Sequence, residues 1–102
     1  MSTITSILEF TFHPKRIDKA ISLFEQVMPR VVEFDGCQSA VVARDRDHPN
    51  MLFVIATWDS FERHEEYQEW RLADGRLPEL EQLAVMLVGA PRDTVCDTLV
   101  TV

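Results

Sequence analysis

The stretch "FVIATWDSFERHEEYQEWR", Phe53–Arg71, begins with a run of β-branched and aromatic residues and ends with residues that favour a helix. The first part is typical of a strand, and this strand stops at Trp58. Asp59 or Ser60 is then suited to cap a helix, and Asp59 with Glu62 has the spacing of a capping box. The stretch therefore predicts a strand that passes directly into a helix, with a tryptophan at the junction.

The chain on both sides of this stretch completes an antiparallel sheet. Alternating or continuous apolar runs predict strands at residues 3–12, 37–45, 51–58 and 93–102. Helical periodicity predicts helices over residues 17–31, after Ser60, and over residues 79–88. Pro14 suits the first turn of the long helix, whereas Pro29 is expected to end or kink it. Turn-forming residues at 46–50 predict a hairpin, and "ADGRLP" at 73–78 interrupts the last two helices.

The order β-α-β-β-α-(α)-β defines the expected fold class. It is the order of the split βαβ, or ferredoxin-like, α+β fold, in which helices cover one face of a four-stranded antiparallel sheet. A chain of 102 residues is large enough for one core but not for two, so residues 1–102 are expected to form a single domain.

The strands are apolar on both faces, although helices should cover only one. In the strand 51–58 the two faces are Val54, Ala56 and Trp58 on one side, and Met51, Phe53 and Ile55 on the other. A second copy of the same sheet is the simplest cover, so we expect a homodimer whose sheets pack face to face. The alternative is a monomer with a bare apolar surface, which is rare among soluble proteins.

Composition excludes several classes of partner. A net charge of −7 argues against nucleic acid and against an anionic membrane surface. No apolar run is long enough to cross a bilayer, and "MSTITSILEF" does not have the pattern of a signal peptide. Cys37 and Cys96 are too few and too far apart for a disulfide framework. We therefore expect a cytoplasmic protein with two free thiols.

The search for cofactor and metal motifs is negative. The chain has no GxGxxG or P-loop sequence, and the histidines at positions 13, 48 and 64 have no second ligand at metal spacing. We expect the protein to bind no nucleotide, flavin, haem or metal.

The helix after Ser60 carries an unusual set of side chains. At about 100° per residue, His64, Tyr67 and Arg71 fall on one stripe, and Trp70 lies further round the helix. Such a stripe could hold a flat, polar ligand through stacking and hydrogen bonds. The alternative is that Tyr67 and Trp70 pack against the neighbouring helix while His64 and Arg71 form an exposed rim.

The region "FDGCQSAVVARDRDHPNMLFVIATWDSFERHEEYQEWR", with the amphipathic helix before it, resembles the antibiotic biosynthesis monooxygenase family. The shared marks are "DGC" before the second strand, an arginine-aspartate pair and an asparagine in the hairpin, and a third strand closing in "WDS". The resemblance spans most of residues 4–90 and implies a dimeric α+β barrel. It also implies small enzymes, several of which oxidise phenols or quinols with molecular oxygen and without flavin, metal or haem.

The resemblance also suggests roles for individual residues. Trp58 matches the tryptophan that lines the family's pocket, and Asn50 falls in the hairpin that approaches it. Tyr67 stands where many members have a histidine, which weakens a proton-transfer role at that position. The expected catalytic residues are Trp58, His64 and Arg71, and the expected substrate-binding residues are Asn50, Tyr67 and Trp70. The alternative is a dimeric binding or stress-response module of the same fold without catalysis.

Overall fold

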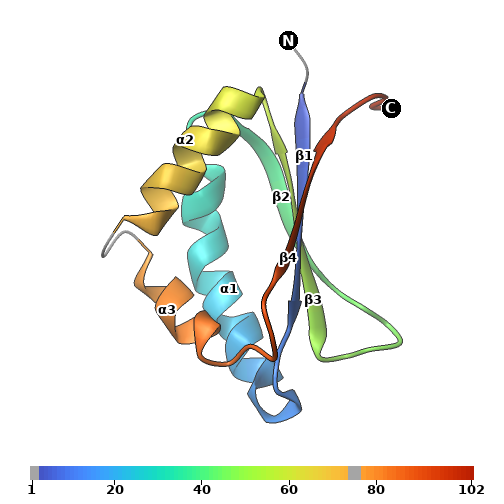
Figure 1. Ribbon diagram of the computed structural model, residues 1–102, viewed down its shortest axis with the longest axis vertical. Helices are drawn as coiled ribbons and strands as arrows, with labels where there is room; N and C mark the ends of the chain where they lie inside the picture. The colour runs from blue at the N-terminus through green and yellow to red at the C-terminus, as the bar shows by residue number, and fades with distance from the viewer. Residues whose placement is uncertain (1–2, 74–76) are drawn as a thin grey trace.

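The computed structural model describes residues 3–73 and 77–102. Within them, four strands form one antiparallel sheet in the order β2-β3-β1-β4 (Figure 1). The strands are β1 (Ile4–Thr11), β2 (Cys37–Arg44), β3 (Met51–Trp58) and β4 (Arg92–Asp97). The helices α1 (Ile17–Val32), α2 (Phe61–Leu72) and α3 (Pro78–Ala84) lie together on one face, and a 3₁₀ turn, η1 (Pro14–Arg16), precedes α1 (Figure 1). The predicted α+β, ferredoxin-like fold is confirmed.

The register of the two central strands determines which side chains meet the helices. Ser6 of β1 lies opposite Ala56 of β3, and Ile4 lies opposite Trp58. Since paired residues of an antiparallel sheet share a face, these side chains all point toward the helices. Ile7 and Ile55 are also paired, one position along, and point to the other face. No helix of the described chain covers that second face (Figure 1).

Two groups of buried side chains form the core between sheet and helices. The first surrounds Phe12, which is completely buried and packs edge-on against Phe24 of α1. The second joins Trp58 and Tyr67 to Val31, at the other end of α1. Helix α1 supplies both groups because its buried residues recur at helical spacing: Ala20, Leu23, Phe24, Val27 and Val31.

Helix α1 does not end at Pro29. It continues to Val32, one residue beyond the predicted helix, so of the two effects expected of Pro29, an end or a kink, the end does not occur. Pro29 is exposed, and the hydrogen bond that it cannot donate is therefore lost on the solvent side. Val27 and Val31 are buried on the opposite side and hold the last turn against the core.

The ends of α3 and β4 differ most from the sequence-based expectation. Helix α3 is shorter than residues 79–88, because turn hydrogen bonds follow Ala84 and Gly89 adopts a φ of +76°. Strand β4 stops at Asp97 instead of continuing to residue 102, because its partner β1 begins at Ile4. Part of the expected interruption at 73–78, residues 74–76, lies outside the described residues. None of the described helices is long and apolar enough to cross a membrane.

Candidate active site

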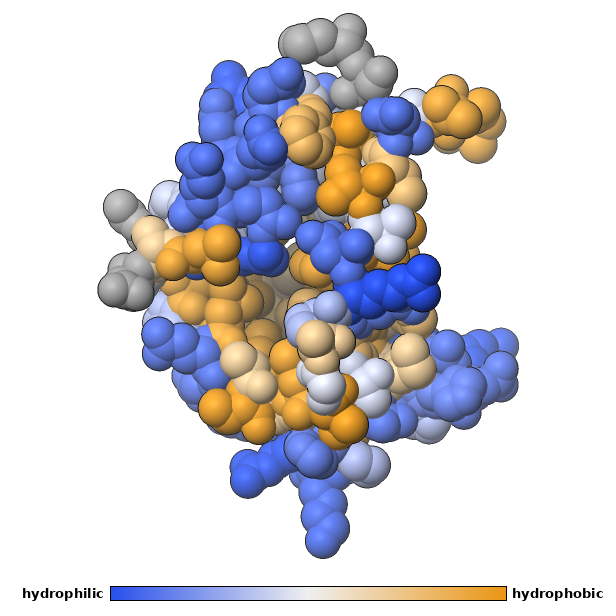
Figure 2. Space-filling model, in the orientation of Figure 1, coloured by the Kyte–Doolittle hydropathy of each residue, from blue (hydrophilic) through white to orange (hydrophobic). Residues whose placement is uncertain are grey.

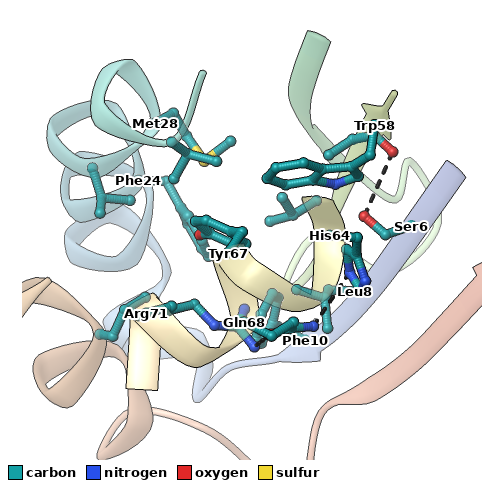
Figure 3. Close-up of a pocket in the computed structure, with 15 residues that line it drawn as sticks. Ser6, Leu8, Phe10, Phe24, Met28, Trp58, His64, Tyr67, Gln68 and Arg71 are labelled. Carbon is teal, nitrogen blue, oxygen red and sulfur yellow. Dashed lines mark hydrogen bonds between the residues drawn. The ribbon is translucent and has the colours of Figure 1, made fainter. Parts of the chain in front are cut away.

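A cavity lies between the sheet and the three helices (Figure 3). Most of its wall is apolar and comes from β1, β3, α1 and α3, while its polar groups gather on one side. These polar or aromatic side chains are Ser6, Trp58, His64, Tyr67, Gln68 and Arg71. The space that a water-sized molecule can occupy is about 50 Å³. Figure 2 shows a hollow on this side of the molecule, with hydrophobic residues on part of its rim and hydrophilic residues on the rest.

Trp58 forms one wall of the cavity at the end of β3. It is only 1% exposed, and its ring centroid lies 4.9 Å from that of Tyr67 and 5.7 Å from that of His64. The indole Nε1 is buried and has no hydrogen-bond partner among residues 3–73 and 77–102. A buried N–H without an acceptor is costly, so this edge of the ring is suited to meet a ligand oxygen.

Helix α2 brings the other predicted groups to the cavity. It begins at the N-cap Ser60, whose hydroxyl accepts a hydrogen bond from the Arg63 amide at 3.3 Å. Asp59 does not cap the helix, because its carboxylate accepts a hydrogen bond from Gln38 instead. With this start, His64, Tyr67 and Arg71 all line the cavity.

The spacing between α2 and the strands depends on Gly36. Its φ of +95° is one that residues with a side chain rarely adopt, and its carbonyl accepts a hydrogen bond from Asp59 N at 2.8 Å. A Cβ at this position would lie 2.5 Å from Cβ of Arg63, in the first turn of α2. The missing side chain therefore permits the close approach of α2 to the turn before β2.

Burial keeps His64 and Tyr67 neutral near pH 7. His64 is 5% exposed, and its burial lowers the pKa of the imidazole; Arg71 lowers it further, against the opposing charges of Asp93 and Glu65. Burial raises the pKa of the Tyr67 phenol, against the effect of Arg71. The alternative that His64 belongs to an exposed rim is therefore wrong.

Arg71 supplies the positive charge on the cavity wall. Its guanidinium carbon lies 5.6 Å from the centroid of the Tyr67 ring, which is within cation–π range. It also donates a hydrogen bond to Oε1 of Gln68. An arginine stays charged under all ordinary conditions, so the cavity has a fixed cation close to an aromatic wall.

Sequence reasoning did not identify Gln68 or Ser6. Gln68 Nε2 lies 3.3 Å from His64 Nε2, and Ser6 Oγ donates a long hydrogen bond, 3.5 Å, to the carbonyl of Ala56. Gln68 could have been found, because it follows His64 by four residues and precedes Arg71 by three. Ser6 had no comparable signal, since a serine within a strand is ordinary.

Two predicted substrate-binding residues lie outside the cavity. Asn50 donates a hydrogen bond from Nδ2 to the carbonyl of Phe12 at 3.1 Å and so fixes the hairpin to the end of β1. Trp70 packs against Phe34, with ring centroids 5.4 Å apart, on the side of α2 that faces Arg30. Their positions support structural roles.

No metal site is apparent in residues 3–73 and 77–102. Within these ranges, no three side chains of His, Cys, Asp or Glu lie close enough together to hold a metal ion. Cys37 and Cys96 are free thiols, and burial raises the pKa of Cys37.

The fold agrees with comparisons with known proteins. The chain belongs to the antibiotic biosynthesis monooxygenase family, whose model matches residues 3–75. Among solved structures, SnoaB, a cofactor-independent oxygenase from Streptomyces nogalater, has a TM-score of 0.81 at 19% identity, over 99% of this chain and 97% of its own. Rv0793 from Mycobacterium tuberculosis has a TM-score of 0.82 at 19% identity, over 98% of each chain.

A conserved protein from Methanosarcina mazei Go1 is similar as well, with a TM-score of 0.84 at 13% identity, over 97% of this chain and 95% of its own. At these identities the structural likeness establishes the fold. No match was found among curated protein sequences.

Proposed function

We propose that this protein is a cofactor-independent monooxygenase that oxidises a phenolic, quinol or anthrone-type aromatic molecule with molecular oxygen. The observation that carries the proposal is the cavity itself, where the rings of Trp58 and Tyr67 face an apolar wall and Arg71 adds a fixed positive charge. Membership of a monooxygenase family supports it, as does the likeness to a protein described as a cofactor-independent oxygenase.

The chemistry needs little from the protein. An electron-rich phenolate can pass one electron to oxygen directly once it has lost its proton. The protein then has to bind the ring, favour the anion and exclude bulk water. Trp58 forms a wall beside the ring, Arg71 stabilises the phenolate, and His64 or Tyr67 forms a hydrogen bond with the phenolic oxygen.

The cavity is too small for an aromatic substrate unless its wall moves. Benzene occupies a cavity of roughly 150 Å³ in another protein, which is larger than the 50 Å³ open to water-sized molecules here. An aromatic substrate must therefore displace part of the wall. Met28 and Leu80 line the cavity with flexible side chains, and we expect them to move when the ligand enters.

We also propose that the protein is a single domain located in the cytoplasm.

We further propose that two copies form a homodimer through the uncovered face of the sheet. The uncovered face carries Ile7, Phe53 and Ile55 at its centre, and Val41 toward the β2 edge is 55% exposed. A bare apolar surface of this kind favours a second copy as its cover.

Oxygen consumption tests the activity. Purified protein is supplied with a panel of hydroquinones and anthrones, and oxygen uptake is followed with an electrode against heat-inactivated protein. We expect uptake above background, with quinone formation, for at least one member. If no member is oxidised although one binds in the cavity, the protein is instead a small-molecule-binding module of the same fold.

A further inference from the structure

The orientation of the Gln68 amide is determined by Arg71. A guanidinium can only donate hydrogen bonds, so the atom of Gln68 that it contacts must be the carbonyl oxygen, Oε1. The amide nitrogen Nε2 then points to the other side, where it lies 3.3 Å from Nε2 of His64. Figure 3 shows Arg71, Gln68 and His64 in this order along α2.

This orientation fixes the tautomer of His64. An amide nitrogen donates but does not accept, so the imidazole Nε2 that receives the bond must carry no proton. The ring is buried and is therefore neutral, which leaves the single ring proton on Nδ1. His64 Nδ1 is consequently an N–H donor.

Two buried donors without acceptors now lie beside the cavity. Nδ1 of His64 and Nε1 of Trp58 are both buried and both lack a hydrogen-bond partner within the described residues. They belong to rings whose centroids are 5.7 Å apart, and both rings line the cavity. Buried donors are normally paired, so the vacant acceptor position points to a ligand or to an ordered water.

We propose that Arg71 and Gln68 are positioning residues that hold His64 as an Nδ1–H donor, and that His64 and Trp58 together bind the ionised or carbonyl oxygen of the aromatic ligand. The proposal rests on the proposed function in one respect: it takes this cavity as the ligand site. It narrows the ligand class to aromatic molecules that present an acceptor oxygen to these two nitrogens.

A consequence concerns the proton of a phenolic substrate. Neither Nδ1–H of His64 nor Nε1–H of Trp58 can accept it, and the lone pair on Nε2 of His64 already receives a bond from Gln68. His64 therefore stabilises the oxygen after ionisation and does not remove its proton. The substrate enters as the anion or as a carbonyl tautomer.

The tautomer can be measured without any substrate. Protein labelled with ¹⁵N-histidine is studied by long-range ¹H–¹⁵N NMR correlation, and the His64 signals are assigned by their loss in His64→Gln. We expect Nδ1 protonated and Nε2 unprotonated in the wild-type protein. A wild-type Nε2–H pattern would overturn the proposal.

The isosteric variant Gln68→Glu reverses the hydrogen bond. A carboxylate can only accept, so Nε2 of His64 should become protonated in this variant. Gln26→Glu, the same change at an exposed site on α1, should leave the wild-type pattern. If Gln68→Glu folds and still shows an unprotonated Nε2, Gln68 does not set the tautomer.

Binding of 4-nitrophenol tests the donor pair, because its phenolate absorbs visible light and the probe needs no oxidation. The bound probe should ionise at lower pH than the free probe, and the indole N–H signal of Trp58 and the Nδ1 signal of His64 should both shift. Trp58→Phe should weaken phenolate binding by roughly tenfold or more, whereas Trp70→Phe should not.

Unchanged Nδ1 and indole signals on saturation with 4-nitrophenol would mean that the donors hold only a water molecule, and the proposal fails. An absence of oxygen uptake with every substrate would instead refute the oxygenase activity and leave the NMR and binding results intact.

Discussion

Trp58 at the end of β3 and Tyr67 in α2 pack with their ring centroids 4.9 Å apart and their planes inclined by 33°. The pair joins the sheet to the helix and is also a wall of the cavity. A change at either residue therefore affects the packing of the core and the shape of the cavity at once, and tests of the proposed function must measure both stability and activity.

Replacement of Trp58 by phenylalanine should reduce turnover and leave the fold intact. A flat wall remains, but the indole N–H and part of the ring surface are lost. Turnover by oxygen uptake and thermal unfolding are measured side by side, with Trp70→Phe as the same change outside the cavity. Wild-type turnover with lowered stability would show that Trp58 only packs. Trp58→Ala should cost about 3–5 kcal/mol of stability, because it leaves a large hole in the core.

Removal of Arg71 should raise the pH at which a bound phenol ionises. The guanidinium favours the anion, so Arg71→Ala makes the phenolate harder to form. The measurement is the absorbance of bound 4-nitrophenol as a function of pH. Arg63→Ala is a suitable control, since Arg63 lies on the same helix but pairs with Asp35 and Glu66 at the surface. Equal curves for wild type and Arg71→Ala would exclude a role for this charge.

Stability should decrease as the pH falls below about 6.5. The folded protein lowers the pKa of His64 from 6.5, mainly through burial, so the unfolded chain binds the proton more tightly. The free energy of unfolding is therefore highest above 6.5 and declines with pH until His64 is protonated in the folded state as well. Urea unfolding between pH 7.5 and 5 should show a shallower decline for His64→Gln than for His13→Gln, in which an exposed histidine is replaced. Parallel slopes in the two variants would contradict the assignment.

A charge on the uncovered face of the sheet should break the proposed dimer. Ile55 is paired with Ile7 at the centre of that face, so Ile55→Glu would place a carboxylate inside a sheet-to-sheet interface. Analytical ultracentrifugation at micromolar concentration should give a dimer for the wild type and a monomer for this variant. Leu72→Glu, at an exposed position on α2, should remain dimeric. A wild-type protein that sediments as a monomer would refute the dimer itself.

The sequence predicted the sheet well because period-two patterns and turn residues act locally. Strand β3 was predicted with its observed bounds, from Met51 to Trp58. Helix α1 was predicted to residue 31 and ends at Val32. Proline is unfavourable inside a helix, but the buried Val27 and Val31 hold the last turn in the folded chain. Tertiary packing overrode the local rule.

The cavity was predicted only in part, because helical spacing shows which side chains share a face of α2 but not which of them are buried. The spacing grouped His64, Tyr67 and Arg71, and these three do line the cavity. It could not show that Trp70 would turn to Phe34, or that Gln68 would bridge two of its neighbours. Both outcomes depend on contacts that only the folded chain creates.

The close approach at Gly36 links the dimensions of the cavity to a residue that does not line it. Any side chain at this position would press on Cβ of Arg63 and lift the first turn of α2, which carries His64 one residue later. One added carbon in a surface turn would then widen the binding space without replacing any group that touches the ligand. The size of the proposed ligand site is therefore open to change through the scaffold, while the chemical groups that line it stay the same.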